Sequence, residues 1–176
     1  MITAMLRSIL QESIDHTLIR TVLIAGLMCV TTLVAAAPVR LLDGRCEVAV
    51  PDGWRVDATY GDAGVVLQPP DPRAWPVEIA AWAAPDGAEQ SAEGAAAGHE
   101  AVLRRAQAYT RTDAAPINAA DGLEGLLVTG RVTTDAGEVT SLFAAFARAG
   151  RYYVAGTFAV PGHADRALER YLRPVL

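Results

Sequence analysis

The side chains that could carry out catalysis are few and scattered. From residue 38 onward the chain contains two serines, Ser91 and Ser141, and neither lies in the Gly-x-Ser-x-Gly turn of a nucleophilic serine. The same stretch holds His99, His163 and Cys46, and none of them stands at a metal-ligand spacing such as His-x-x-x-His. The sequence therefore predicts no catalytic residues, no metal site and no cofactor.

Phosphate-binding and calcium-binding motifs are also missing. Gly122, Gly125 and Gly130 are not followed by a lysine and a helix, as a phosphate-binding loop requires. His99 and Glu100 are adjacent on a predicted helix, so their side chains project about 100° apart and do not chelate one ion. We interpret His99 as a residue at the edge of the core.

The candidate binding residues are aromatic, with one arginine. Trp75 and Arg73 lie in the proline-rich segment 70–76, and Trp54 and Trp82 lie in predicted strands. Tryptophan and arginine are over-represented at binding hot spots, so these four residues are candidates for a recognition surface. The alternative is that all three tryptophans pack under loops or helices.

The composition excludes some partners. The chain has 176 residues, of which 52% are hydrophobic and 20% charged, which is typical of a single folded domain. Its formal net charge is −5, and its arginines form no cluster, so the sequence offers no electrostatic basis for binding nucleic acid.

An apolar segment near the N-terminus predicts export. Nineteen uncharged residues separate Arg20 from Arg40, and they end in small residues, as a secretory signal does. The best cleavage register is Val34-x-Ala36. We therefore divide the chain into residues 1–37, a signal peptide or membrane anchor, and residues 38–176, one domain.

Other interpretations of this segment stay open. It is long enough to remain as an uncleaved anchor, which would be the one contact with a membrane. Cys29 could carry a lipid, although Met28 precedes it where lipoprotein signals have a small residue, and a buried core helix is a further alternative. If the segment is removed, Cys46 is the one remaining thiol, no intrachain disulfide can form, and Cys46 is expected to be a small buried apolar side chain.

The periodicity predicts an α+β domain with a single antiparallel sheet of about six strands and two main helices. The strands are expected at 46–50, 54–59, 65–68, 77–83, 123–133, 139–148 and 152–160. The helices are expected from Ser91 to about Arg111 and from Ala164 to the C-terminal region, and residues 112–122 are expected to form a loop. Strand 139–148 is apolar on both faces, so it should lie near the middle of the sheet. The first helix has an apolar stripe of alanines and should pack close to the sheet.

Two motifs in this order resemble the PsbP-like superfamily, which includes the DcrB-like envelope proteins and the Ran-binding Mog proteins. In those proteins a strand ending in P-x-G-W opens the domain, and a later G-R-x-Y turn precedes the last long strand. The matching residues here are Val50 to Trp54 and Gly150 to Tyr153, and the resemblance covers roughly residues 44–176. It implies an antiparallel sheet flanked by helices that acts in binding or assembly, and it carries over no binding residue.

These observations favour a non-enzymatic binding or assembly module, exported to the periplasm or cell envelope with or without an N-terminal anchor. Its expected partner is an envelope protein or a small ligand. Two alternatives remain: a secreted hydrolase-type enzyme with an unrecognised site, and a DcrB-like chaperone for a secretion effector, although the N-terminal segment conflicts with the latter.

Overall fold

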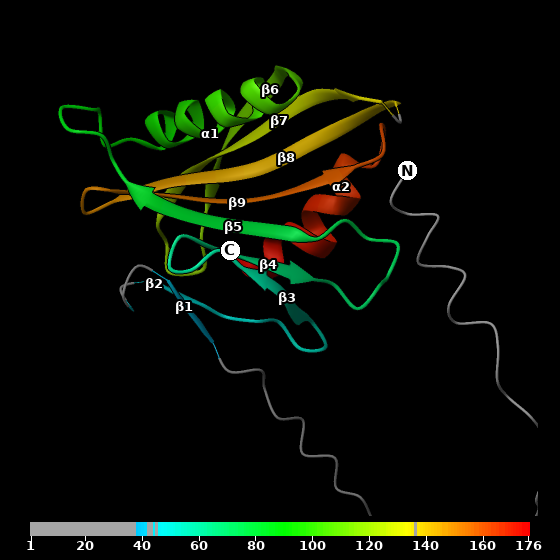
Figure 1. Ribbon diagram of the computed structural model, residues 1–176, viewed down its shortest axis with the longest axis horizontal. Coiled ribbons are helices and arrows are strands. Elements are labelled where there is room, and N and C mark those ends of the chain that lie inside the picture. Colours follow the sequence, from blue (N-terminus) through cyan, green and yellow to red (C-terminus); the bar gives the residue numbers. More distant parts are fainter. Residues whose placement is uncertain (1–37, 42–43, 45, 136) are drawn as a thin grey trace, which may run out of the picture. The chain divides into compact units, whose positions relative to one another are not determined.

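The computed structural model describes residues 38–176, apart from 42–43, 45 and 136, and the predicted signal or anchor at 1–37 lies outside the described residues. A seven-stranded antiparallel sheet has the order β3-β4-β5-β9-β8-β7-β6 (Figure 1). Its strands are β3 (Arg55–Thr59), β4 (Gly64–Gln68), β5 (Val77–Ala83), β6 (Ala108–Asn118), β7 (Glu124–Thr134), β8 (Gly137–Arg148) and β9 (Arg151–Ala159).

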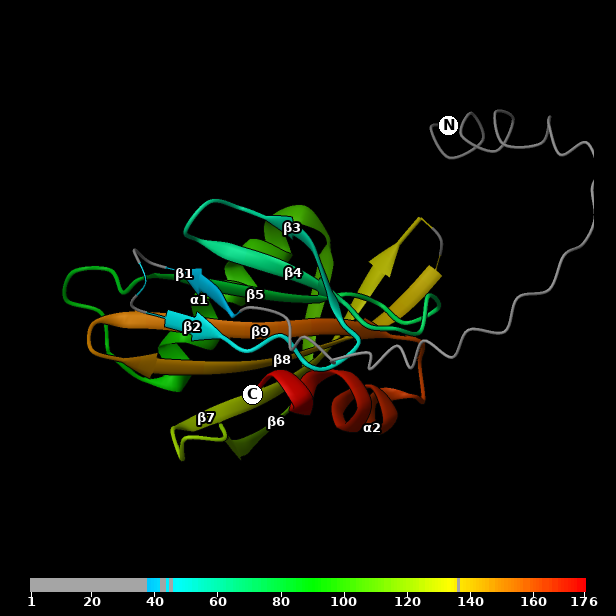
Figure 2. The same ribbon diagram turned by 90° about the horizontal axis from the view of Figure 1, so that it is seen from below.

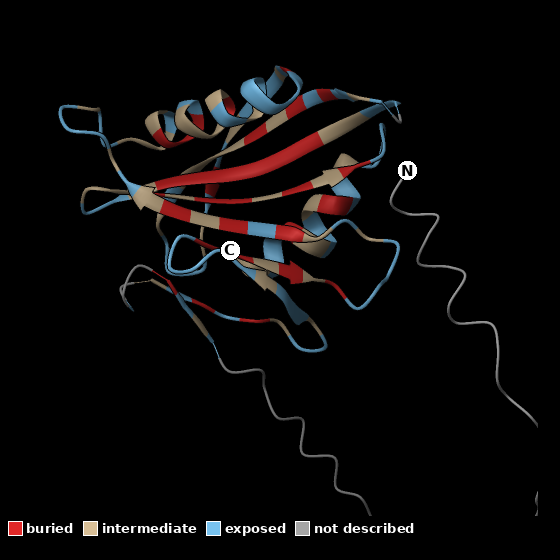
Figure 3. Ribbon diagram, viewed as in Figure 1, coloured by how far each residue is buried: buried red, intermediate tan, exposed pale blue. Residues whose placement is uncertain are grey.

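The predicted antiparallel sheet is confirmed, and so is the inner position of its most apolar strand. β8 lies between β9 and β7, and its residues 141–146 are all buried, which appears as the long red stretch in Figure 3. A strand that is apolar on both faces needs cover on both sides. The structure supplies that cover with one helix on each face of the sheet, as Figures 1 and 2 show together.

Helix α1 (Ala92–Ala106) covers one face and begins as the sequence predicts. The Ser91 side chain caps it by accepting a hydrogen bond from the Gly94 amide at 3.1 Å. Ala95 and Ala96 are fully buried against Phe143 and Val154 of the sheet. The alanine stripe therefore lets the helix backbone approach the strands closely.

The terminal helical segment covers the other face. It comprises α2 (Ala164–Ala167), a π-helical segment η1 (Leu168–Leu172) and a 3-10 turn η2 (Arg173–Val175). Leu172 is fully buried in a cluster that includes Leu67, Val77 and Leu142 of the sheet. Pro174 lacks an amide donor, which agrees with the end of regular helix at this point.

Residues 46–50 do not join the main sheet, contrary to our prediction. β1 (Val39–Leu41) and β2 (Cys46–Val48) form a separate two-stranded antiparallel sheet. Leu41 and Val48 are buried in the same cluster as Leu172. The alternation in 46–50 thus reflects one buried face of a hairpin that packs on the domain, and alternation alone does not identify the pairing partner.

The prediction was also wrong for residues 107–118. Helix α1 ends at Ala106, and the chain continues as the edge strand β6 instead of a longer helix and a loop. Most β6 side chains are exposed, so the strand carries little apolar alternation. Pro116 suggested a loop, but an edge strand tolerates proline because one row of its amides has no strand partner.

None of the helices within the described residues is long and apolar enough to cross a membrane.

Candidate binding pocket

A cavity of about 830 Å³ opens on the face of the sheet that the terminal helical segment covers. Its lining comes from β2 and the residue after it, Ile79 of β5, the adjoining ends of β8 and β9, the loop between β6 and β7, and the last three residues of the chain. The Ala120 amide donates a hydrogen bond to a Leu176 oxygen at 2.9 Å, which ties the loop to the C-terminal residues. The volume falls within the range of pockets that hold small molecules.

A tight turn between β8 and β9 builds the charged end of this cavity. Ala149 and Gly150 both have positive φ, at 50° and 75°, as the two central residues of a type I′ hairpin turn do. The turn places Arg148 directly opposite Arg151 in the antiparallel register, and Phe146 opposite Tyr153. Because side chains two residues apart share a face, both pairs line the cavity.

The cavity therefore has an apolar floor beside a charged rim. Phe146 and Tyr153 form part of the floor with Ile79 and Ala155. Phe146 and Ala155 are almost fully buried, and Tyr153 is half-buried.

Most charges at the rim are paired. Arg148 Nη1 lies 3.0 Å from Asp121 Oδ2, and Glu47 Oε2 lies 3.6 Å from Arg40 Nε. Arg151 is half-buried, and within the described part of the chain its guanidinium forms no ion pair or hydrogen bond. Within the described residues, Arg151 is therefore a cation of the cavity lining that has no anionic partner.

Cys46 also lines the cavity, as a free and half-buried thiol. Burial raises the pKa of this thiol above its usual value. Since the thiolate is the nucleophilic form, Cys46 stays protonated at neutral pH and adds apolar surface to the cavity. The sequence-based expectation of a fully buried side chain is thus only partly met.

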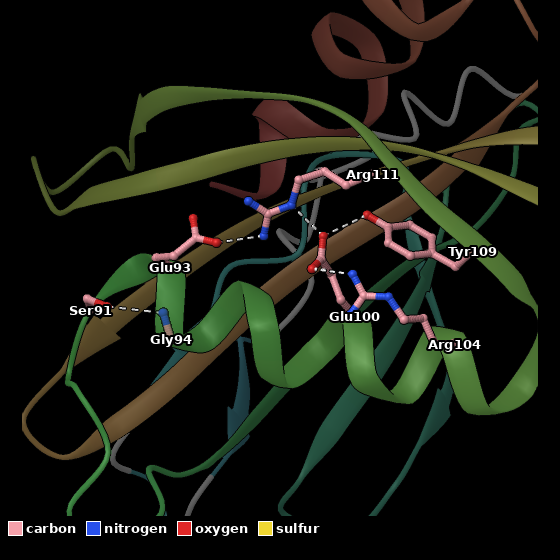
Figure 4. Close-up of polar contacts among 7 residues, drawn as sticks. All are labelled: Ser91, Glu93, Gly94, Glu100, Arg104, Tyr109 and Arg111. Atoms are coloured by element: carbon pink, nitrogen blue, oxygen red, sulfur yellow. Dashed lines mark hydrogen bonds and ion pairs between the residues drawn. The ribbon is translucent and has the colours of Figure 1, made fainter.

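A second polar cluster joins α1 to β6 on the opposite face of the sheet (Figure 4). Glu100 is 3% exposed, and its Oε1 accepts hydrogen bonds from Arg111 Nε at 2.6 Å and from the Tyr109 hydroxyl at 3.1 Å. Its Oε2 accepts a bond from Arg104 Nη2 at 3.0 Å, and Arg111 also pairs with Glu93 at 2.8 Å. The cluster compensates the buried carboxylate fully.

The electrostatics of this cluster keep Glu100 ionised. Burial on its own would raise the pKa of Glu100, but hydrogen bonds from Arg111 and Tyr109 and the charges of Arg111 and Arg104 bring that pKa below its usual value. Burial and the charge of Glu100 raise the pKa of Tyr109. Both shifts preserve the charged carboxylate and the neutral phenol, so the cluster holds the helix on the edge strand and does not transfer protons near neutral pH.

His99 packs against the core beside this cluster, as its interpretation as a core-edge residue predicts. Its ring lies edge-on to Phe143 with 4.6 Å between the centroids. Burial lowers the pKa of His99 to about 4, against a smaller opposing effect of Glu100. His99 is therefore neutral near pH 7.

The structure does not bring the four candidate binding residues together. Trp54 packs with the cluster under the terminal helical segment, whereas Trp82 packs with the cluster under α1 and lies edge-on to Tyr152 at 5.9 Å. Both side chains are half-buried. Arg73 is exposed, and Trp75 is 45% exposed.

Trp75 is partly packed and held in a fixed loop. Its ring lies edge-on to Phe158 at 5.6 Å. Gln68 Nε2 donates to the Ala74 carbonyl at 3.3 Å, and the Thr157 hydroxyl donates to the Pro76 carbonyl at 2.9 Å. Trp75 thus combines a stabilising contact with an accessible face.

Sequence reasoning missed the residues of the cavity. The resemblance placed a turn at Gly150 before the last long strand, and the register of that hairpin places Arg148 opposite Arg151. The pairing of Arg148 with Arg151 was the one feature of the cavity that the sequence could have revealed. The contributions of β2, the β6–β7 loop and the C-terminal residues depend on tertiary packing and left no local pattern. Within the described residues, no three His, Cys, Asp or Glu side chains are grouped so as to hold a metal ion.

Comparison with known proteins identifies the fold through solved structures. No protein-family model matches the chain, and no curated protein does. Cyanobacterial PsbP (CyanoP) from Synechocystis sp. PCC 6803 is 14% identical with a TM-score of 0.51, over 70% of this chain and 79% of that one.

Two further solved structures are similar at lower scores. LpqN of Mycobacterium tuberculosis, described as involved in cell envelope biogenesis, is 18% identical with a TM-score of 0.46, over 79% of this chain and 86% of that one. PA94 of Pseudomonas aeruginosa, of unknown function, is 14% identical with a TM-score of 0.45, over 80% and 95%. The order of strands and helices and the similarity to CyanoP together identify the domain as having the PsbP-like fold.

Proposed function

We propose that this protein is an exported, non-enzymatic binding module of the cell envelope that holds a small amphipathic ligand in the cavity between the sheet, β2 and the C-terminal residues. The observation that carries the proposal is the cavity of about 830 Å³, whose lining combines buried apolar side chains with exposed or half-buried charged ones. Pockets of this size and character are typical of small-molecule sites. The apolar segment between Arg20 and Ala36 supports the proposal of export.

The chemistry of the lining supports binding over catalysis. Its thiol, Cys46, is protonated at neutral pH, and two of its acids, Asp121 and Glu47, are neutralised by arginines. The polar cluster around Glu100 lies on the other face of the sheet and cannot act on a ligand in the cavity. The lining side chains can therefore hold and orient a ligand, and we assign them no bond-breaking step.

A cavity-filling variant tests this function. Ala49 is exposed and lines the cavity, so Ala49→Trp would fill part of it at little cost to the core. Ala97→Trp is the matched control, because Ala97 is exposed on α1 at the other face. Binding of the neutral fluorescent probe N-phenyl-1-naphthylamine should weaken about tenfold in Ala49→Trp and stay unchanged in Ala97→Trp. Equal binding by both variants and the wild type would contradict a ligand site in this cavity.

A second candidate function is capture of another envelope protein through the loop from Pro70 to Pro76. The observation that favours it is the exposed face of Trp75 on a loop that hydrogen bonds to Gln68 and Thr157 already hold in place. A loop ordered beforehand loses little entropy when a partner binds. Trp75→Ala should therefore reduce capture of such a partner, and Tyr60→Ala, at an exposed aromatic on another loop, should leave it unchanged.

A further inference from the structure

We infer that the ligand of this cavity is an amphipathic anion whose oxyanion head group, a carboxylate or a phosphate, binds between Arg151 and Arg148. This inference rests on the proposed function and adds the charge of the ligand. Its apolar part would lie on Phe146, Tyr153 and Ile79.

Two arginines face each other across β8 and β9. Arg148 and Arg151 are direct partners in the register of β8 and β9, and both line the cavity. Like charges directly opposite each other on a sheet are destabilising. Asp121 already offsets part of that repulsion at Arg148, and an anion bound at Arg151 would remove the rest.

Arg151 differs from Arg148 in having no anionic partner among the described residues. Asp121 occupies Arg148 at 3.0 Å, whereas Arg151 makes no ion pair or hydrogen bond with the residues that the structure describes. Glu47 does not balance Arg151, because it pairs with Arg40. The half-buried Arg151 thus keeps its donors available for an oxyanion, which a guanidinium can bind in bidentate geometry.

Along both strands, an arginine of the cavity lining lies next to an aromatic side chain on the same face. Along β9, Arg151 and Tyr153 follow each other on one face, and along β8 so do Arg148 and Phe146. A ligand whose head group meets the arginines therefore has its apolar part directed onto the two aromatic rings. That combination fits an anion with a hydrocarbon tail better than a small inorganic ion.

Three probes with the same tail test the inference on the full chain: decanoate, decyl phosphate and decanol, measured by displacement of N-phenyl-1-naphthylamine. At least one of the two anions should bind about tenfold more tightly than decanol, since a charge-assisted hydrogen bond at a half-buried arginine contributes at the lower end of its usual range. The tighter of the two anions distinguishes a carboxylate ligand from a phosphate ligand.

Matched variants assign the preference to the cavity. Arg151→Gln should reduce the anion preference to about twofold or less, and Arg105→Gln, which removes an equal charge from an exposed position on α1, should leave it unchanged. The melting temperature of Arg151→Gln should not fall, because Arg151 has no partner to lose. If Arg151→Gln does not fold, the comparison of the three probes on the wild-type protein still decides whether the cavity prefers an anion.

The outcomes separate the two proposals. Decanol binding as tightly as both anions, or an anion preference that survives Arg151→Gln, would overturn the inference and leave a neutral ligand for the cavity. Failure of all three probes to bind, together with equal probe binding by Ala49→Trp, would overturn the proposed function itself.

Discussion

Glu100 shows how a single buried charge can hold two elements together. It accepts hydrogen bonds from Arg104 on its own helix and from Tyr109 and Arg111 on β6. Glu100→Gln should lower the free energy of unfolding by about 2 kcal/mol, less than for a fully enclosed pair because Arg111 is 27% exposed and can be hydrated. Urea denaturation would measure the loss.

Glu93→Gln is the control for that experiment. Glu93 also pairs with Arg111, but it is exposed, so its loss should cost less than about 1 kcal/mol. Equal losses in the two variants would show that burial of Glu100 does not set its contribution.

His99 predicts a pH dependence of stability. Its pKa in the folded protein is lowered to about 4 by burial, whereas in the unfolded chain it is near 6.5. The unfolded state therefore binds more protons below about pH 6.5, and His99 should cost about 2 kcal/mol of stability between pH 7 and pH 5. Thermal or urea unfolding at both pH values would measure this, and the pH dependence should flatten in His99→Leu. An unchanged slope in that variant would contradict the buried, neutral His99.

Substitution of Trp75 distinguishes a role of this residue in stability from a role in binding. Trp75→Ala removes a half-buried ring and its contact with Phe158, so we expect a loss of about 1 to 2 kcal/mol of stability. If the loop binds an envelope protein, capture of that partner should fall as well, whereas Tyr60→Ala, at an exposed aromatic on another loop, should leave capture intact. A loss above about 3 kcal/mol with unchanged capture would make Trp75 a purely structural residue.

At the residue scale, sequence reasoning identified packing roles better than binding roles. The alanine stripe, the start of the helix at Ser91 and the position of His99 at the edge of the core follow from local pattern and are confirmed. The tryptophans of β5 and of the start of β3 were candidates for recognition because of their type alone. Residue type does not say which face of a strand is covered, and each of these tryptophans is half-buried against a different core cluster.

At the scale of elements, the β8–β9 turn positions the cavity, and it carries conformational strain. Ala149 has φ of 50°, a left-handed conformation that costs a residue with a Cβ about 1 kcal/mol. Ala149→Gly should therefore stabilise the protein by about 0.5 to 1 kcal/mol, measured by urea denaturation. Ala147→Gly, two residues earlier within β8, should destabilise it by a similar amount. Destabilisation by Ala149→Gly would contradict the type I′ turn.

The elements that sequence predicted best are those with a complete burial pattern. β8 and β9 have strong apolar patterns, and α1 has an N-terminal cap, so their types were predicted correctly. β6 was missed because an exposed edge strand leaves little periodic signal and Pro116 suggested a break. The pairing of β1 with β2 was missed because pairing depends on the rest of the fold.

At the scale of the whole molecule, the sequence predicted an α+β fold like that of the PsbP-like proteins, and the topology and the similarity to CyanoP confirm this fold. The cavity could not be predicted in the same way. Its walls come from five separate parts of the chain, and each part contributes only a few residues. Because such a pocket forms only when these parts pack together, no single sequence motif predicts it.

The central claim is that the cavity holds a small ligand, and native mass spectrometry of the protein purified from its own envelope tests it most directly. The wild-type protein and Ala97→Trp should each retain one bound small molecule that dissociates on collisional activation, and Ala49→Trp should be recovered empty. Recovery of all three proteins at the mass of the polypeptide alone, or with the same bound molecule in each, would contradict the account.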